Sequence, residues 1–151
     1  MKHLILFAGA LLALLSTPAC TADDQDEIDR RAIENYLSSN NINATAHPSG
    51  IYYVIDTPGS GGSPTLDNEV EVKYKGYLLS GDVFDQTTGT STAKFPLRNL
   101  ITGWQVAIPL LQKGGKGTFF IPSSLGYGDN PPSGIPANAV LIFDIELVNF
   151  K

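Results

Sequence analysis

The sequence predicts an α+β domain in which one antiparallel sheet wraps around a single short helix, preceded by a short N-terminal helix. Fifteen glycines and ten prolines, most of them after residue 47, indicate many turns and short strands. In that region only residues 99–111 carry apolar side chains at three- and four-residue spacing. We expect this helix to bury its apolar face against the sheet. The 151 residues, 42% of them hydrophobic, are enough for one such core.

Residues 1–19 have the pattern of an export signal: Lys2, an apolar run at 4–15 that is too short to cross a bilayer, and then small residues up to Cys20. Cys20 is the only cysteine and cannot form an internal disulfide. The segment resembles a bacterial lipoprotein signal, in which Cys20 is lipidated. That pattern prefers leucine where Thr17 stands, so ordinary signal cleavage remains the alternative. The resemblance implies an exported protein anchored at the outer membrane. Its location on the periplasmic face or on the cell surface is left as two alternatives.

Residues 20–47 are expected to form an acidic tether and then a short helix at 26–40. A helix this short needs a partner surface, and we expect its apolar stripe to pack on the main domain rather than on a second copy of the chain. The protein is therefore predicted to be a monomer. The stripe consists of Ile28, Ala32, Ile33, Tyr36 and Leu37.

Residues 48–151 are predicted to form one domain. The clearest strand is 69–79, where apolar and charged side chains alternate. Pro109 lacks a backbone donor, so the helix is expected to end by Ile108. Further strands are expected at 51–56, 83–85, 95–97, 117–121 and 139–150.

The composition excludes several kinds of chemistry. A net charge of −5 offers no basic surface for nucleic acid. His3 lies in the signal, and His47 is the only other histidine, so a Ser-His or Cys-His pair could use His47 alone, and no zinc ligand set is available. No phosphate-binding glycine motif occurs. The sequence predicts no metal and no cofactor.

Two polar residues stand out as candidates. Asp85 follows Phe84 just after a tight turn, which places an acid and an aromatic ring at one rim of the sheet, although such an aspartate is commonly a turn residue. Tyr127 lies in a Gly- and Pro-rich loop, where a ring has little local core to join. Trp104, the only tryptophan, is first interpreted as a core residue.

A set of motifs runs in order from about residue 51 to the C-terminus. They are V-E-V-K-Y-K-G-Y-L, G-D-V-F-D, F-P-L, L-I-T-G-W, G-G-K-G-T-F-F-I-P, L-G-Y-G and I-P-A-N-A-V-L-I-F-D-I-E-L. Together they resemble the FKBP-type peptidyl-prolyl isomerases. The resemblance implies a half-barrel sheet curled around the helix, with an apolar pocket that turns X–Pro bonds of exported or envelope proteins without a cofactor. Its implied ligands are proline-containing polypeptides and macrolide inhibitors.

Carried over by motif, Trp104 would form the pocket floor, and Phe84, Asp85 and Tyr127 would be the catalytic residues. The N–H of Ile101 and the hydroxyl of Tyr127 would donate to a substrate carbonyl. Ala93 stands where many members carry an aromatic residue, and the loop before the helix looks shortened, which bears on substrate preference and macrolide affinity. A non-catalytic proline-binding module or chaperone, and a purely structural envelope lipoprotein, are the alternatives. The substrate-binding set is Tyr74, Leu100, Ile101, Trp104 and Phe143.

Overall fold

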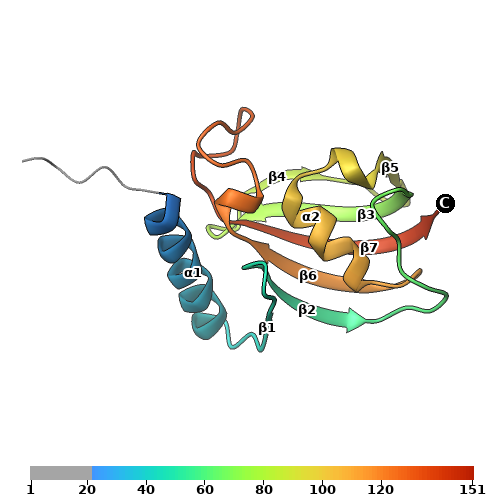
Figure 1. The fold of residues 1–151 in the computed structure, drawn as a ribbon, viewed down its shortest axis with the longest axis horizontal. Helices are drawn as coiled ribbons and strands as arrows, with labels where there is room; N and C mark the ends of the chain where they lie inside the picture. The colour runs from blue at the N-terminus through green and yellow to red at the C-terminus, as the bar shows by residue number, and fades with distance from the viewer. Residues whose placement is uncertain (1–21) are drawn as a thin grey trace, which may run out of the picture.

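The computed structural model describes residues 22–151, so the predicted signal segment and Cys20 lie outside the described residues. Seven strands form one antiparallel sheet in the order β1-β2-β6-β7-β3-β4, and β5 pairs with β3 beside β4 (Figure 1). The predicted fold class is therefore confirmed. The strands are β1 (Thr45–Ala46), β2 (Tyr52–Thr57), β3 (Glu69–Leu78), β4 (Val83–Gln86), β5 (Ala93–Pro96), β6 (Lys116–Ile121) and β7 (Leu141–Phe150).

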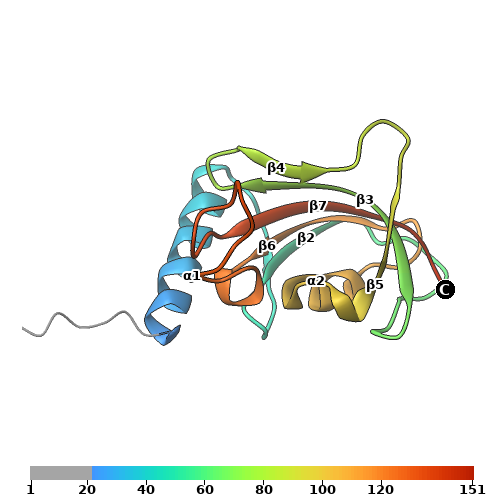
Figure 2. The same cartoon turned by 90° about the horizontal axis from the view of Figure 1, so that it is seen from above.

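The sheet curves over the short helix α2 (Thr102–Ala107), which lies in its concave side (Figure 2). The 3-10 turns η1 (Leu97–Asn99) and η2 (Ile108–Leu110) flank the helix. Pro109 lies in η2, so the regular helix ends before it, as the missing donor predicts. A Cβ atom on Gly103 would stand 2.4 Å from a side-chain carbon of Ile121, so only glycine allows this approach of α2 to β6.

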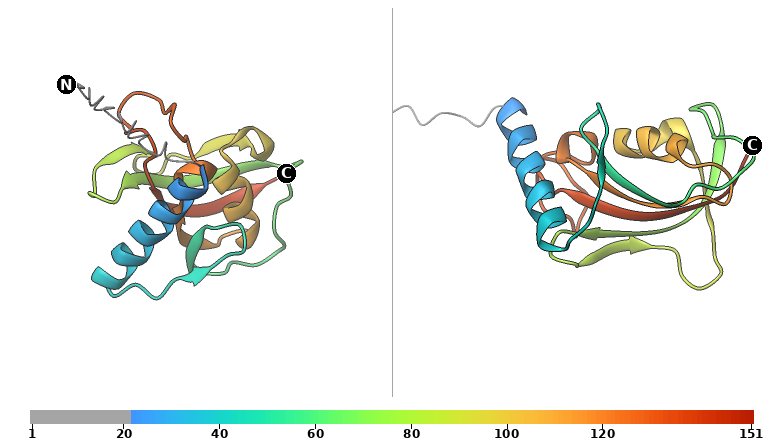
Figure 3. Two further views of the ribbon diagram at one scale, coloured as in Figure 1. Left: turned by 60° about the vertical axis from the view of Figure 1, so that its left-hand side comes forward. Right: turned by 90° about the horizontal axis from the view of Figure 1, so that it is seen from below.

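The longer helix α1 (Ala22–Ser39) packs on the other face of the same sheet, at one end (Figure 3). Ile33 and Leu37 are buried there together with Phe120 and Ile142. Neighbouring strand residues point to opposite faces, and accordingly Phe119, next to Phe120, belongs to the α2 core instead. The expected packing of the N-terminal helix within its own chain is confirmed.

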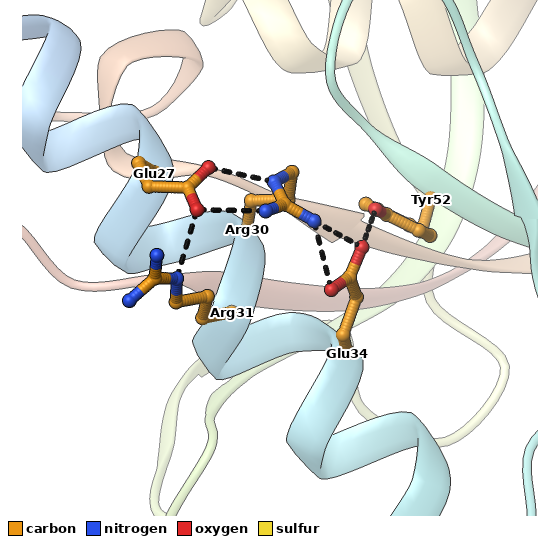
Figure 4. A network of polar contacts seen from close by, with 5 residues as sticks. All are labelled: Glu27, Arg30, Arg31, Glu34 and Tyr52. Carbon is orange, nitrogen blue, oxygen red and sulfur yellow. Dashed lines mark hydrogen bonds and ion pairs between the residues drawn. The ribbon is translucent and has the colours of Figure 1, made fainter.

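α1 begins at Ala22, four residues earlier than predicted, so most of the acidic segment expected as a tether is helical. Acidic residues are stabilising at a helix N-terminus, and this favours the extension. Arg30 bridges Glu27 and Glu34 at 2.7 and 2.8 Å, and Arg31 contacts Glu27 at 2.8 Å (Figure 4). Hydrogen bonds from the two arginines lower the pKa of Glu27 to about 2.

Two further elements differ from the sequence prediction. β1 was not predicted because two residues carry too little alternation to be recognised. The long loop before β7 contains a 3-10 turn, η3 (Ser123–Leu125), directly after β6. Within residues 22–151 no helix combines the length and apolar character needed to cross a membrane.

Candidate active site

A hollow of about 190 Å³ opens between α2, the concave face of the sheet and the loop that follows η3. The strands β3, β4, β5 and β7 contribute one side of it, and the residues around the start of α2 contribute the other. Its wall is mainly aromatic and aliphatic. The lining residues are Tyr74, Phe84, Asp85, Phe95, Leu100, Ile101, Trp104, Tyr127 and Phe143.

Trp104 is 4% exposed and lines the hollow from α2. The rings of Tyr74, Phe95 and Phe143 meet the indole edge to face, with centroid distances of 5.2, 6.3 and 5.2 Å. This is a preferred geometry for aromatic pairs. The buried indole N–H has no hydrogen-bond partner among residues 22–151, so ring packing alone orients the side chain.

Phe84 and Phe143 form a second edge-to-face pair, 5.5 Å apart at an interplanar angle of 86°. They close on each other above Gly76, where an added Cβ would stand 2.7 Å from both rings. Gly76, near the end of β3, therefore leaves the space in which this aromatic wall forms.

Asp85 lies at the edge of the hollow, where the Tyr74 hydroxyl donates a hydrogen bond of 2.6 Å to its Oδ2 atom. Burial and this carboxylate hold the pKa of Tyr74 well above its usual range. Burial, and then the charge of Asp85, also raise the pKa of Tyr127. A tyrosine hydroxyl is protonated at neutral pH even at its ordinary pKa, so both groups can donate. The Tyr127 hydroxyl makes no hydrogen bond within the described part of the chain.

Ile101 precedes the first turn of α2, and its carbonyl accepts the N–H groups of Trp104 and Gln105 at 2.9 and 3.2 Å. Gln105 also fixes this corner, because its Nε2 donates to the Leu100 carbonyl at 2.8 Å. The N–H of Ile101 donates no hydrogen bond to any described residue. Besides the buried indole N–H of Trp104, the lining thus carries two donors without a partner among the described residues, the backbone N–H of Ile101 and the hydroxyl of Tyr127.

Other parts of the described structure are weaker candidates for a functional site. The Nδ1 atom of His47 lies 2.9 Å from the Ser49 hydroxyl, but it also accepts the Ser49 N–H at 3.1 Å, which makes the pair a local feature of an exposed turn. A larger hollow of about 370 Å³ on the outer face of the sheet has a charged wall that includes Lys73, Lys75 and Glu146. Within residues 22–151 no three His, Cys, Asp or Glu side chains gather where they could hold a metal ion.

The structure brings all eight residues proposed from the sequence for catalysis or substrate binding to one hollow. Their roles stay predictions. Phe95 completes the wall and was not among them, although it pairs with Val70 on the inward face of β3, and this alternation could have identified it. Ala93, which departs from the family pattern, is two residues away on the same strand and does not line the hollow.

Comparisons with known proteins agree on one family. Residues 61–148 match the profile of the FKBP-type peptidyl-prolyl cis-trans isomerases. The FKBP-type peptidyl-prolyl cis-trans isomerase FkpA of Aeromonas hydrophila is 37% identical over 129 residues, which cover 83% of this chain and 48% of that protein. The chain spans about half or less of the length of the first curated relatives it matches.

Solved structures give the same result. The crystal structure of FkpA from Escherichia coli superimposes with a TM-score of 0.75 at 32% identity, covering 86% of this chain and 61% of that one. A 1.6 Å structure of a peptidyl-prolyl cis-trans isomerase from Pseudomonas syringae gives 0.73 at 29% identity, covering 90% of this chain and 99% of that one.

Proposed function

Because the chain belongs to the FKBP-type peptidyl-prolyl cis-trans isomerase family, we propose that it catalyses rotation about X–Pro bonds in exported or envelope polypeptides. The observation that carries the proposal is the aromatic hollow over Trp104, whose lining includes the N–H of Ile101 and the hydroxyl of Tyr127, both unpartnered within residues 22–151. Such a site suits a proline ring and the carbonyl of the residue before it.

Desolvation supplies the catalytic effect in this proposal. Loss of amide resonance opposes rotation with a barrier of about 18–20 kcal/mol, and unaided X–Pro isomerisation takes roughly tens to hundreds of seconds. The twisted transition state has less charge separation than the planar amide. Moving it from water into an apolar hollow therefore costs less than moving the ground state, and the barrier falls. This step needs no nucleophile and no cofactor.

The lining residues take distinct roles. The rings of Phe84 and Phe143 contact the proline, and Trp104 supports it from below. The N–H of Ile101 and the hydroxyl of Tyr127 donate to the carbonyl of the preceding residue and hold it while the bond turns. Asp85, fixed by the Tyr74 hydroxyl, acts electrostatically at the edge.

An isomerase assay with an X–Pro reporter peptide tests these roles. Phe84→Ala, Asp85→Ala and Tyr127→Ala are each expected to lower kcat/KM about tenfold, which corresponds to about 1.4 kcal/mol of transition-state stabilisation. Tyr36→Phe, on α1 and far from the hollow, is the matched control and should leave the rate unchanged. Full activity in all three site variants would refute the assignment.

A proline-binding module or chaperone that uses the same hollow is the second candidate. It is favoured by the exposed edge of Tyr127, 38% accessible, which a held segment could cover. Trp104 is the only tryptophan, so its fluorescence reports occupancy of the hollow. A peptide that changes this fluorescence but turns over at its unaided rate would establish the binding module instead.

Export and anchoring form a separate part of the proposal, supported by the pattern of residues 1–19 and the single cysteine that follows them. Cys20 would carry the lipid and hold the domain at the outer membrane. In cells fed a labelled fatty acid, the natural chain should incorporate the label and Cys20→Ala should not. An unlabelled natural chain that is nevertheless shortened would indicate ordinary signal cleavage.

The monomeric state is supported by the burial of Ile33 and Leu37 against the sheet of the same chain, which leaves most of the α1 stripe covered. Light scattering should give the mass of one chain. A mass of two chains would refute it.

Macrolide inhibitors are proposed as ligands of the same hollow and should compete with the reporter peptide.

A further inference from the structure

Two polar residues are fully buried among residues 22–151, and they contact each other. Asp29, on α1, is 2% exposed, and Ser123, the first residue of η3, is 1% exposed. They are 94 positions apart in the chain. Figure 1 shows the first turns of α1 beside η3, at the end of the sheet from which the loop toward β7 departs.

Both oxygens of the Asp29 carboxylate are engaged. Oδ2 accepts the backbone N–H of Ser123 at 2.6 Å, and Oδ1 accepts Nε2 of Gln25 at 2.7 Å. A buried carboxylate is costly unless such bonds compensate it. The cap residue of η3 is Pro122, whose side chain has no acceptor, and η3 has no side-chain cap of its own. Asp29 therefore supplies from another element the acceptor that η3 lacks.

Ser123 links this hydrogen bond to the loop beside the hollow. Its carbonyl accepts the N–H groups of Gly126 and Gly128 at 3.0 and 2.9 Å. These two residues are the neighbours of Tyr127 on either side, and the carbonyl of Gly128 in turn accepts the N–H of Asn138 at 2.7 Å. The backbone around Tyr127 is thus held by Ser123, and Ser123 is held by Asp29.

We infer that Asp29 is a positioning residue, which sets the place of the Tyr127 hydroxyl at the hollow through Ser123. The inference rests on the proposed function only in assigning Tyr127 a contact with substrate. It makes α1, which lies across the sheet from α2, part of the machinery of the site.

Amide hydrogen exchange in the full chain tests the positioning without any need for activity. Asp29→Leu keeps the number and branching of the side-chain heavy atoms and removes both acceptors, and it should lower protection at the N–H groups of Gly126 and Gly128 by about tenfold or more. Asp29→Asn keeps one neutral acceptor, so its effect should be smaller. Tyr52→Phe is the matched control, because it removes the 2.8 Å bond from Tyr52 to Glu34 that also ties α1 to the sheet (Figure 4). It should leave both amides unchanged.

A double-mutant cycle tests the connection to Tyr127. In the natural background, Asp29→Leu should lower kcat more than it changes KM. In a Tyr127→Phe background it should have little further effect, because the hydroxyl that it positions is already gone. Equal losses in both backgrounds would make Asp29 merely structural and overturn the inference.

The outcomes separate the two proposals. If the natural chain has no isomerase activity, the proposed function fails while the exchange data still decide the positioning. If Asp29→Leu does not fold, Asp29→Asn replaces it in both experiments. Unchanged protection at Gly126 and Gly128 in a folded Asp29 variant would overturn the inference.

Discussion

At the scale of single residues, two tyrosine hydroxyls at the polar edge of the hollow differ in their hydrogen bonds. Tyr74 donates to Asp85 at 2.6 Å, whereas the Tyr127 hydroxyl has no partner among the described residues. Burial and the Asp85 charge raise the pKa of both tyrosines. The hydrogen bond distinguishes them, because it engages the Tyr74 hydroxyl with the carboxylate and leaves the Tyr127 hydroxyl without a partner among the described residues. The difference supports the proposed roles, in which Tyr74 fixes Asp85 and Tyr127 contacts the substrate.

The raised pKa values predict a defined alkaline limit. Tyrosines of the unfolded chain titrate near pH 10, and the folded protein holds the protons of Tyr74, Tyr77 and Tyr127 more tightly. Below about pH 10 these groups should therefore cause no change of the free energy of unfolding with pH. Above about pH 10 the free energy of unfolding should fall as the pH rises. Denaturant titrations over this range measure it. A stability that rises above about pH 10 would contradict the assignment.

The candidate site was largely predictable at this scale, because its residues belong to motifs that keep their order along the chain. Phe95 was missed since a single aromatic residue in a short strand looks like ordinary core. Asp29 could not be found from the sequence. An aspartate in an acidic stretch is predicted to be exposed to solvent, and only the packing of α1 on η3 buries it.

At the scale of elements, β3 shapes the hollow because it has no side chain at Gly76. Gly76 is the position where Phe84 and Phe143 meet above the strand. In a strand, alanine normally replaces glycine with a small gain. Here the added methyl group would collide with two rings, so the steric cost dominates.

Gly76→Ala should accordingly destabilise the protein by about 1–3 kcal/mol, as overpacking does, and should lower kcat/KM because the aromatic wall is displaced. Chemical denaturation and the isomerase assay measure the two effects. The neighbouring exposed residue offers the control: Lys75→Arg keeps its charge over the Tyr77 ring and should change neither quantity. A fully stable and active Gly76→Ala protein would show that the two rings do not need this space.

The strands were predictable from alternation and from Gly and Pro between them, with ends correct to within one or two residues. The start of α1 was not. Acidic residues are compatible both with a solvated tether and with the first turns of a helix. In the structure, Gln25 in the added turn donates to the Asp29 carboxylate four residues further along the helix.

At the scale of the whole molecule, one sheet carries a core on each face. The α2 face holds the hollow, while the α1 face is filled by Ile33, Leu37, Phe120 and Ile142 without lining it. Stability contributed by the apolar side chains of this second core should thus be separable from activity on the first, as long as the bond from Asp29 on α1 to Ser123 is kept.

Ile33→Ala tests this separation. Loss of a fully buried isoleucine should lower the free energy of unfolding by about 2–5 kcal/mol, with kcat/KM unchanged at temperatures where the protein stays folded. Ile28→Ala on the same helix, where the side chain is 51% exposed, should cost less than about 0.5 kcal/mol. Equal costs for the two substitutions would contradict the described packing of α1.

The most direct test of the central claim is exchange NMR on a proline peptide at equilibrium with the protein. Trp104 gives the only indole N–H resonance, so the floor of the hollow can be observed in the same sample. The peptide should shift this resonance and exchange between cis and trans far faster than the roughly tens to hundreds of seconds of the free bond. Phe84→Ala should reduce both effects. Exchange at the unaided rate, with the indole resonance shifted, would contradict isomerisation in this hollow.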